Sequence, residues 1–129
     1  MKLDIQTIPH KQQRYDTVGD YFYKGNSLKI RISQMHDERF EWLVLIHELI
    51  EYVLISLAGV PIEKIDEFDK EFEENRENCQ WGNEIEPGND RLAPYYEQHQ
   101  AANIVERVAA YVLGVEWDAY NNECINLKK

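Results

Sequence analysis

The sequence predicts an α+β domain in which a small N-terminal antiparallel β-sheet packs on about three main helices. Alternation of apolar and polar residues, the period of half-buried strands, occurs in two segments of the first third of the chain. Apolar stripes at helical spacing occupy most of the remainder, and the central stripe carries the sequence HELIE. With 129 residues, 43% of them hydrophobic, residues 1–129 have the size of one domain with a real core.

Three segments near the N-terminus show the patterns of β-strands. Lys2 to Ile8 and Leu28 to Ser33 alternate apolar and polar residues, and Thr17 to Tyr23 is rich in β-branched and aromatic residues. The sequence KGNS at residues 24–27 separates the second and third segments. Because Gly-Asn is a favoured turn between two strands, these two segments are expected to form a β-hairpin.

The central helix is predicted from Phe40 to Ala58, a stretch dominated by Leu, Ile and Val. Asp37 or Ser33 precedes it and can act as the N-cap, because a short polar side chain accepts a hydrogen bond from a free backbone N–H. Gly59 and Pro61 follow it, a common signature of a helix end.

Two further main helices are expected after the central one. Ile62 to Asn78 combines a narrow apolar stripe with an acidic run, which is most simply a solvated face. Cys79 to Pro94 is rich in Gly, Pro and Asn, and is predicted to be a loop that borders the functional site. Tyr95 to Leu113 is the third helix. A short helix around Trp117 is expected next, followed by a polar tail from about residue 121.

The third helix has two distinct strips of residues. Its core face is expected to consist of Ala101, Ile104, Val105, Val108 and Val112. The second strip holds His99, Asn103 and Glu106, and the small residues Ala102 and Ala110 beside it would allow another helix to approach closely.

Charge and composition restrict the classes of function. The formal net charge of −10 argues against a nucleic-acid partner, although an acidic mimic of DNA would have such a charge. Cys79 and Cys124 lie far apart and outside any C-x-x-C pattern, so free thiols are expected. No signal segment or membrane-spanning run is present, which predicts a cytoplasmic protein without a membrane partner.

Residues of the HELIE sequence form a candidate metal site. His47 and Glu51 are four residues apart, so they lie one above the other on a helix, and Glu48 follows on the adjoining strip. No Lys or Arg occurs between Phe40 and Ile62 to neutralise these carboxylates. Because unpaired carboxylates beside a core are costly, a bound cation is expected.

His99 is the best-placed third ligand. Together with His47 and Glu51 it makes a His₂Glu set, which is common in catalytic zinc sites and leaves a position for water. Glu48 would then be the general base that deprotonates this water. Asn103 and Glu106 could orient a ligand, or Glu106 could replace His99 as a ligand.

The chain resembles the minimal zincin core of the ImmA/IrrE-type metallopeptidases. The resemblance covers roughly residues 17–113 and lies in a strand, a helix with H-E-L-I-E, and a later helix reading H-Q-A-A-N-I-V-E. It implies that His47 matches the first ligand, Glu48 the base, Glu51 the second His of H-E-x-x-H, and His99 the downstream Glu ligand. His and Glu have thus exchanged places between the two helices. The additional carboxylate character suits Mn or Fe as well as Zn.

The resemblance implies a small intracellular peptidase of phage or mobile-element type, with a protein or peptide as its substrate. Three alternatives remain open on the sequence alone. The polar residues of the central helix could be a solvent face without a ligand. The chain could be a non-catalytic accessory protein that binds a partner through its acidic surface. It could also be a Mg²⁺-dependent nucleotide pyrophosphohydrolase, which would need several carboxylates and phosphate-binding Lys or Arg.

Overall fold

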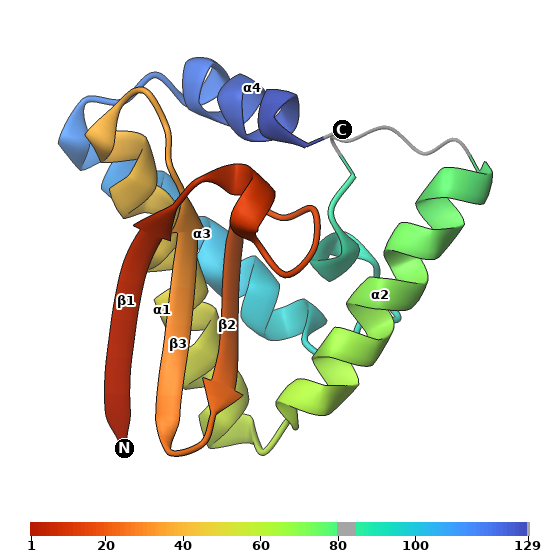
Figure 1. Ribbon diagram of the computed structural model, residues 1–129. Helices are drawn as coiled ribbons and strands as arrows, with labels where there is room; N and C mark the ends of the chain where they lie inside the picture. The colour runs from red at the N-terminus through yellow and green to blue at the C-terminus, as the bar shows by residue number, and fades with distance from the viewer. Residues whose placement is uncertain (80–84, 129) are drawn as a thin grey trace.

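A computed structural model describes residues 1–79 and 85–128 of the chain (Figure 1). Its elements confirm the predicted α+β class, with a three-stranded sheet at the N-terminus and helices in the rest of the described chain. In chain order these elements are β1 (Lys2–Ile8), η1 (His10–Gln12), β2 (Gly19–Lys24), β3 (Ser27–Ser33), α1 (Glu38–Ala58), α2 (Ile62–Cys79), η2 (Pro87–Asn89), α3 (Tyr96–Leu113) and α4 (Trp117–Leu127).

The sheet has the strand order β1-β3-β2, and it is mixed rather than antiparallel. The hairpin of β2 and β3 is antiparallel, as expected, with Gly25 in the left-handed conformation at its turn. The prediction was wrong for β1, which pairs in parallel with β3 from Lys2 opposite Ser27 to Ile8 opposite Ser33. β1 runs in the same direction as β3 and opposite to β2, so pairing with β3 is parallel. The alternation of residues within a strand does not show which neighbouring strand it pairs with.

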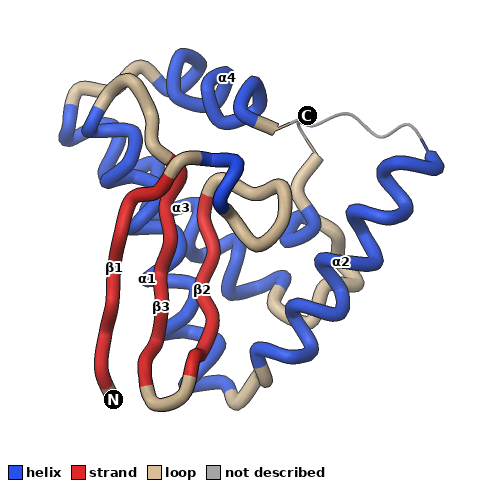
Figure 2. The backbone as a smooth tube through the Cα atoms, in the orientation of Figure 1, coloured by secondary structure: helices blue, strands red, loops and turns tan. Residues whose placement is uncertain are grey.

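The helices form a second layer behind the sheet. Figure 2 shows the three strands on one side of the molecule, with α1 and α3 behind them and α2 to one side. The inward side chains of β3, Leu28, Ile30 and Ile32, are at most 1% exposed. They belong to one core with Leu43 and Ile55 of α1. No helix in the two described ranges has both the length and the apolar character needed to cross a membrane.

Helix α1 begins and ends at residues with the expected signals. The side chain of Asp37 accepts a hydrogen bond from the backbone N–H of Arg39, which identifies Asp37 rather than Ser33 as the N-cap. Gly59 ends the helix in the left-handed conformation, and its N–H donates to the carbonyl groups of Ile55 and Ser56. The HELIE sequence therefore lies in the middle of a long, well-capped helix.

The prediction for the core face of α3 was wrong, because the opposite face of the helix is buried. Its polar strip is buried, with His99 at 5% and Glu106 at 7% exposure, whereas Ile104 is 66% exposed. Ala102 and Ala110, at 0% and 3%, lie on the buried side and allow α3 to pack closely against α1, as expected. The spacing correctly predicted a helix, but the polar residues face inward because side chains of other elements satisfy them there.

The structures of α2 and α4 agree only in part with the sequence-based predictions. Ile65 and Phe72 of α2 are buried as the apolar stripe predicted, and the helix exposes Glu63, Glu67, Glu71 and Glu74 but buries Asp69. The predicted polar tail from about residue 121 was wrong, because α4 continues to Leu127. Its N-cap, Glu116, accepts hydrogen bonds from two backbone N–H groups at the start of the helix. Residues 80–84 of the predicted loop lie outside the described residues.

Candidate metal centre

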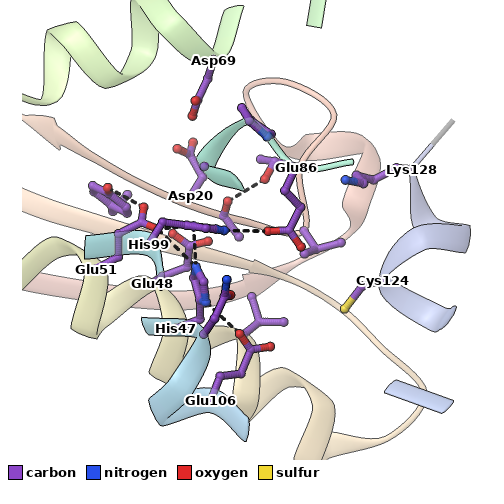
Figure 3. A pocket seen from close by; sticks show the side chains of 18 of the residues that line it. Asp20, His47, Glu48, Glu51, Asp69, Glu86, His99, Glu106, Cys124 and Lys128 are labelled. Atoms are coloured by element: carbon purple, nitrogen blue, oxygen red, sulfur yellow. Dashed lines mark hydrogen bonds and ion pairs between the residues drawn. The ribbon is translucent and has the colours of Figure 1, made fainter. Parts of the chain in front are cut away.

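Three buried side chains from the two central helices converge on one point. Helix α1 contributes His47 and Glu51 from successive turns, and α3 contributes His99 from its first turn. Nε2 of His47 lies 3.2 Å from Oε2 of Glu51 and 3.2 Å from Nδ1 of His99, and the last two atoms are 2.7 Å apart. The three atoms thus form a small triangle, and this cluster could hold a metal ion (Figure 3).

Each side chain of the triangle is fixed by a partner on its far side. Nδ1 of His47 is 2.7 Å from Oε1 of Glu106, and Oε1 of Glu51 accepts a hydrogen bond of 2.7 Å from the hydroxyl of Tyr21. Nε2 of His99 is 3.0 Å from Oε2 of Glu86, an ion-pair distance without the directional geometry of a hydrogen bond. Carboxylates behind histidines are typical of metal sites, because they fix which ring nitrogen faces the ion.

The loop before α3 packs directly on His99. Gly88 in η2 is buried, and a Cβ at this position would be 2.4 Å from Cγ of His99. Only a residue without a side chain fits there, so Gly88 and Glu86 together fix the imidazole from the loop side. The prediction that this loop borders the site is confirmed for its described part.

Glu48 extends from α1 into a cavity of about 140 Å³ beside the triangle. Its carboxylate lies against the start of β2, where a Cβ on Gly19 would be 2.5 Å from Oε1 of Glu48. Burial, followed by repulsion from Glu51, raises the pKa of Glu48 well above its ordinary value. A carboxylate with a raised pKa accepts a proton more readily than an ordinary glutamate does, as a general base must.

The pKa values of His47, Glu51 and His99 are set mainly by hydrogen bonds and charges of the neighbouring histidines and carboxylates. Burial raises the pKa of Glu51, but the hydrogen bonds from His47 and His99 outweigh it and lower that pKa to about 2. Burial disfavours a charged His99, yet Glu51 and Glu86 raise its pKa to about 9. The same competition, with Glu106 and Glu51 as partners, raises the pKa of His47 well above its ordinary value. The site therefore stabilises positive charge between its carboxylates.

The other candidate residues lie in different places. Glu106 contacts His47 and so occupies the predicted orienting position, whereas Asn103 lines the cavity but bonds with Asn89. Cys124 is a free thiol that lines the same cavity from α4. The side chain of Cys79 lies outside the described residues.

Sequence reasoning missed Tyr21, Glu86 and Gly88. Tyr21 was included only as part of a strand, and strand alternation does not show which tyrosine reaches a carboxylate on a helix. Glu86 and Gly88 were covered only by the general prediction for the loop, because sequence alone does not place a loop side chain against a helix.

Comparison of the sequence with protein-family models and with curated proteins, and of the structure with solved structures, gives no match.

Proposed function

We propose that this protein is a metal-dependent hydrolase that acts on a peptide bond, with zinc bound by His47, Glu51 and His99. The observation that carries the proposal is the convergence of one atom from each buried side chain, with separations of 2.7 to 3.2 Å. Ligand atoms of a tetrahedral zinc site with bonds of about 2.0–2.1 Å are about 3.3 Å apart, so the triangle is close to the size needed. Two imidazoles and one carboxylate favour zinc, and the same donors also suit Mn or Fe.

The chain's own residues supply the other parts of a hydrolytic mechanism. When bound, the metal would polarise the scissile carbonyl and acidify a water molecule. Glu48, which extends into the cavity beside the triangle, would take the proton from that water and pass it to the leaving amine. Glu106 and Tyr21 would hold His47 and Glu51 in place during the reaction.

The charge of the cavity supports a peptide rather than a nucleotide as the substrate. Lys128 is the sole Lys or Arg among the described residues that line it. The lining carboxylates are Asp16, Asp20, Glu48, Glu51, Asp66, Asp69, Glu73, Glu86 and Glu106. Such a lining repels phosphate, which weighs against the pyrophosphohydrolase alternative. The resemblance of HELIE to the H-E-x-x-H helix of ImmA/IrrE-type metallopeptidases also supports a peptide bond as the target.

The second candidate is a non-catalytic accessory protein without a metal. One observation favours it: each histidine lies between two carboxylates, so protonated imidazoles could form a closed ion-pair network without any ion. The two candidates differ in whether zinc or protons occupy the centre of the triangle.

Metal content of the untagged protein tests the proposal. After loading with zinc and dialysis, we expect about one equivalent of zinc by elemental analysis. His47→Ala and His99→Ala should lose it, and His36→Ala is the matched control, because its side chain is 76% exposed and pairs with Glu123 on α4. Glu48→Gln should keep zinc and lose hydrolysis of a dye-labelled unfolded protein. A parent protein that retains no zinc contradicts the proposal and favours the accessory protein.

A further inference from the structure

An exposed apolar surface covers the side of α1 and α3 that faces away from the metal centre. The two helices pack side by side and antiparallel, since Arg39 at the start of α1 donates to the carbonyl groups of Leu113 and Gly114 at the end of α3. Eight apolar side chains with exposed fractions from 39% to 87% form what we call the outer helical face. They are Trp42, Val53 and Leu57 of α1 and Ile104, Val105, Val108, Tyr111 and Val112 of α3.

The middle of the outer helical face carries little charge, and the exposed charged residues Glu38, Arg39 and Glu97 lie at its ends, in the first turns of α1 and α3. Between residues 42 and 58 the only charged side chains are those of Glu48 and Glu51, and both point into the cavity. Between residues 98 and 113 they are Glu106, which is buried in the site, and Arg107. The guanidinium of Arg107 lies 4.2 Å from the centre of the Trp117 ring.

We propose that the outer helical face is the interface of a homodimer. A standard interface buries about 800 Å² on each partner, and eight largely exposed side chains that include Trp and Tyr provide apolar surface on that scale. Monomeric proteins rarely expose so large an apolar patch. An apolar face whose middle lacks charge is complementary to itself under two-fold symmetry.

The distribution of charge in the fold is compatible with this association. The acidic helix α2 rises on the side of the molecule opposite β1 (Figure 1), and none of its side chains belongs to the outer helical face. Repulsion between exposed charges is largely screened beyond about 8–10 Å at physiological salt. His99 and Glu106 lie on the opposite side of α3 from Val108, so the dimer leaves both metal centres open.

Analytical ultracentrifugation of the full chain tests the dimer. We expect the parent to sediment at twice the mass of one chain, with a dissociation constant of about 1 µM or tighter for an interface of this size. Val108→Glu adds a charge near the middle of the face and should weaken the dimer at least about 100-fold. Leu3→Glu is the matched control, because Leu3 is 48% exposed but lies on β1 of the sheet, and it should dimerise like the parent.

Circular dichroism and zinc content serve as checks on folding. Val108 is 60% exposed, so Val108→Glu should keep the parent's helical spectrum and its zinc. A monomeric parent at about 100 µM, far above the expected dissociation constant, overturns the proposal and assigns the face to a different protein. A Val108→Glu dimer as tight as the parent's also overturns it, and so does equal weakening by Leu3→Glu. The test requires no metal, so its failure is separate from failure of the hydrolase proposal.

Discussion

Replacing Gly88 by alanine adds a single Cβ atom beside His99 and so tests whether Gly88 places this ligand. The new Cβ would lie 2.4 Å from Cγ and 2.5 Å from Nδ1 of His99, whereas ordinary contact begins at 3.4 Å. The imidazole or the η2 segment must therefore move by about 1 Å, well beyond the tolerance of about 0.2 Å for a metal–ligand bond. We expect the free energy of unfolding without metal to fall by about 1–3 kcal/mol, the usual cost of overpacking.

Zinc affinity should fall with it, by at least about 10- to 100-fold in a competition titration with a chelating dye. Gly25→Ala is the matched control. Gly25 has a φ of 59° and nothing within 4 Å of its added Cβ, so this variant loses about 1–2 kcal/mol of stability through backbone strain alone. Its zinc affinity should equal that of the parent. A Gly88→Ala protein that binds zinc as tightly as Gly25→Ala would refute the role of Gly88 in placing His99.

Three further perturbations have defined outcomes. Glu106→Gln should weaken zinc binding about 10- to 100-fold, measured by the same titration, because His47 loses its carboxylate partner. Ile30→Ala should lower the free energy of unfolding in urea by about 2–5 kcal/mol, because Ile30 is fully buried. Burial raises the pKa of Asp69 from 3.8 to about 7 even though the hydroxyl of Tyr95 donates to it. Between pH 4 and pH 7 the carboxyl group of Asp69 is therefore protonated in the folded state and ionised in the unfolded state. Its contribution to stability is present below pH 4 and lost as the pH rises through 7. Asp69→Asn should gain stability relative to the parent between pH 4 and 8, by at most about 4 kcal/mol in urea unfolding. An equal pH dependence for the two proteins contradicts the raised pKa.

Periodicity predicted the helices and strands well because each element has a marked pattern and clear end signals. The bounds of α1 and α2 differ from the predicted ones by at most two residues at any end, and β1 matches its prediction. The pairing of β1 was not predictable, since any exposed strand edge can accept it. The continuation of α4 was also missed, because residues 121–123 read Asn-Asn-Glu, and Asn has a low helix propensity.

The candidate ligands were predictable because spacing on one helix is a local property. His47 and Glu51 had to share a face of α1 whatever the fold, and a polar strip on a second helix then suggested His99. The direction in which that second strip faces is a tertiary property. Apolar Val108 and polar His99 lie on opposite sides of α3, and packing against α1 and η2 decided that the polar side is inside.

The position of α4 affects how the protein should be handled. Lys128, directly after this helix, lines the cavity, while Met1 lies at the far end of β1, away from α4 in Figure 1. A polyhistidine tag joined at the C-terminal end would bring additional imidazoles to the mouth of the cavity, where they would compete for the same cation. A tag at the other terminus starts from the opposite end of the sheet. Metal stoichiometries measured with C-terminal tags would therefore report the tag as well as the protein.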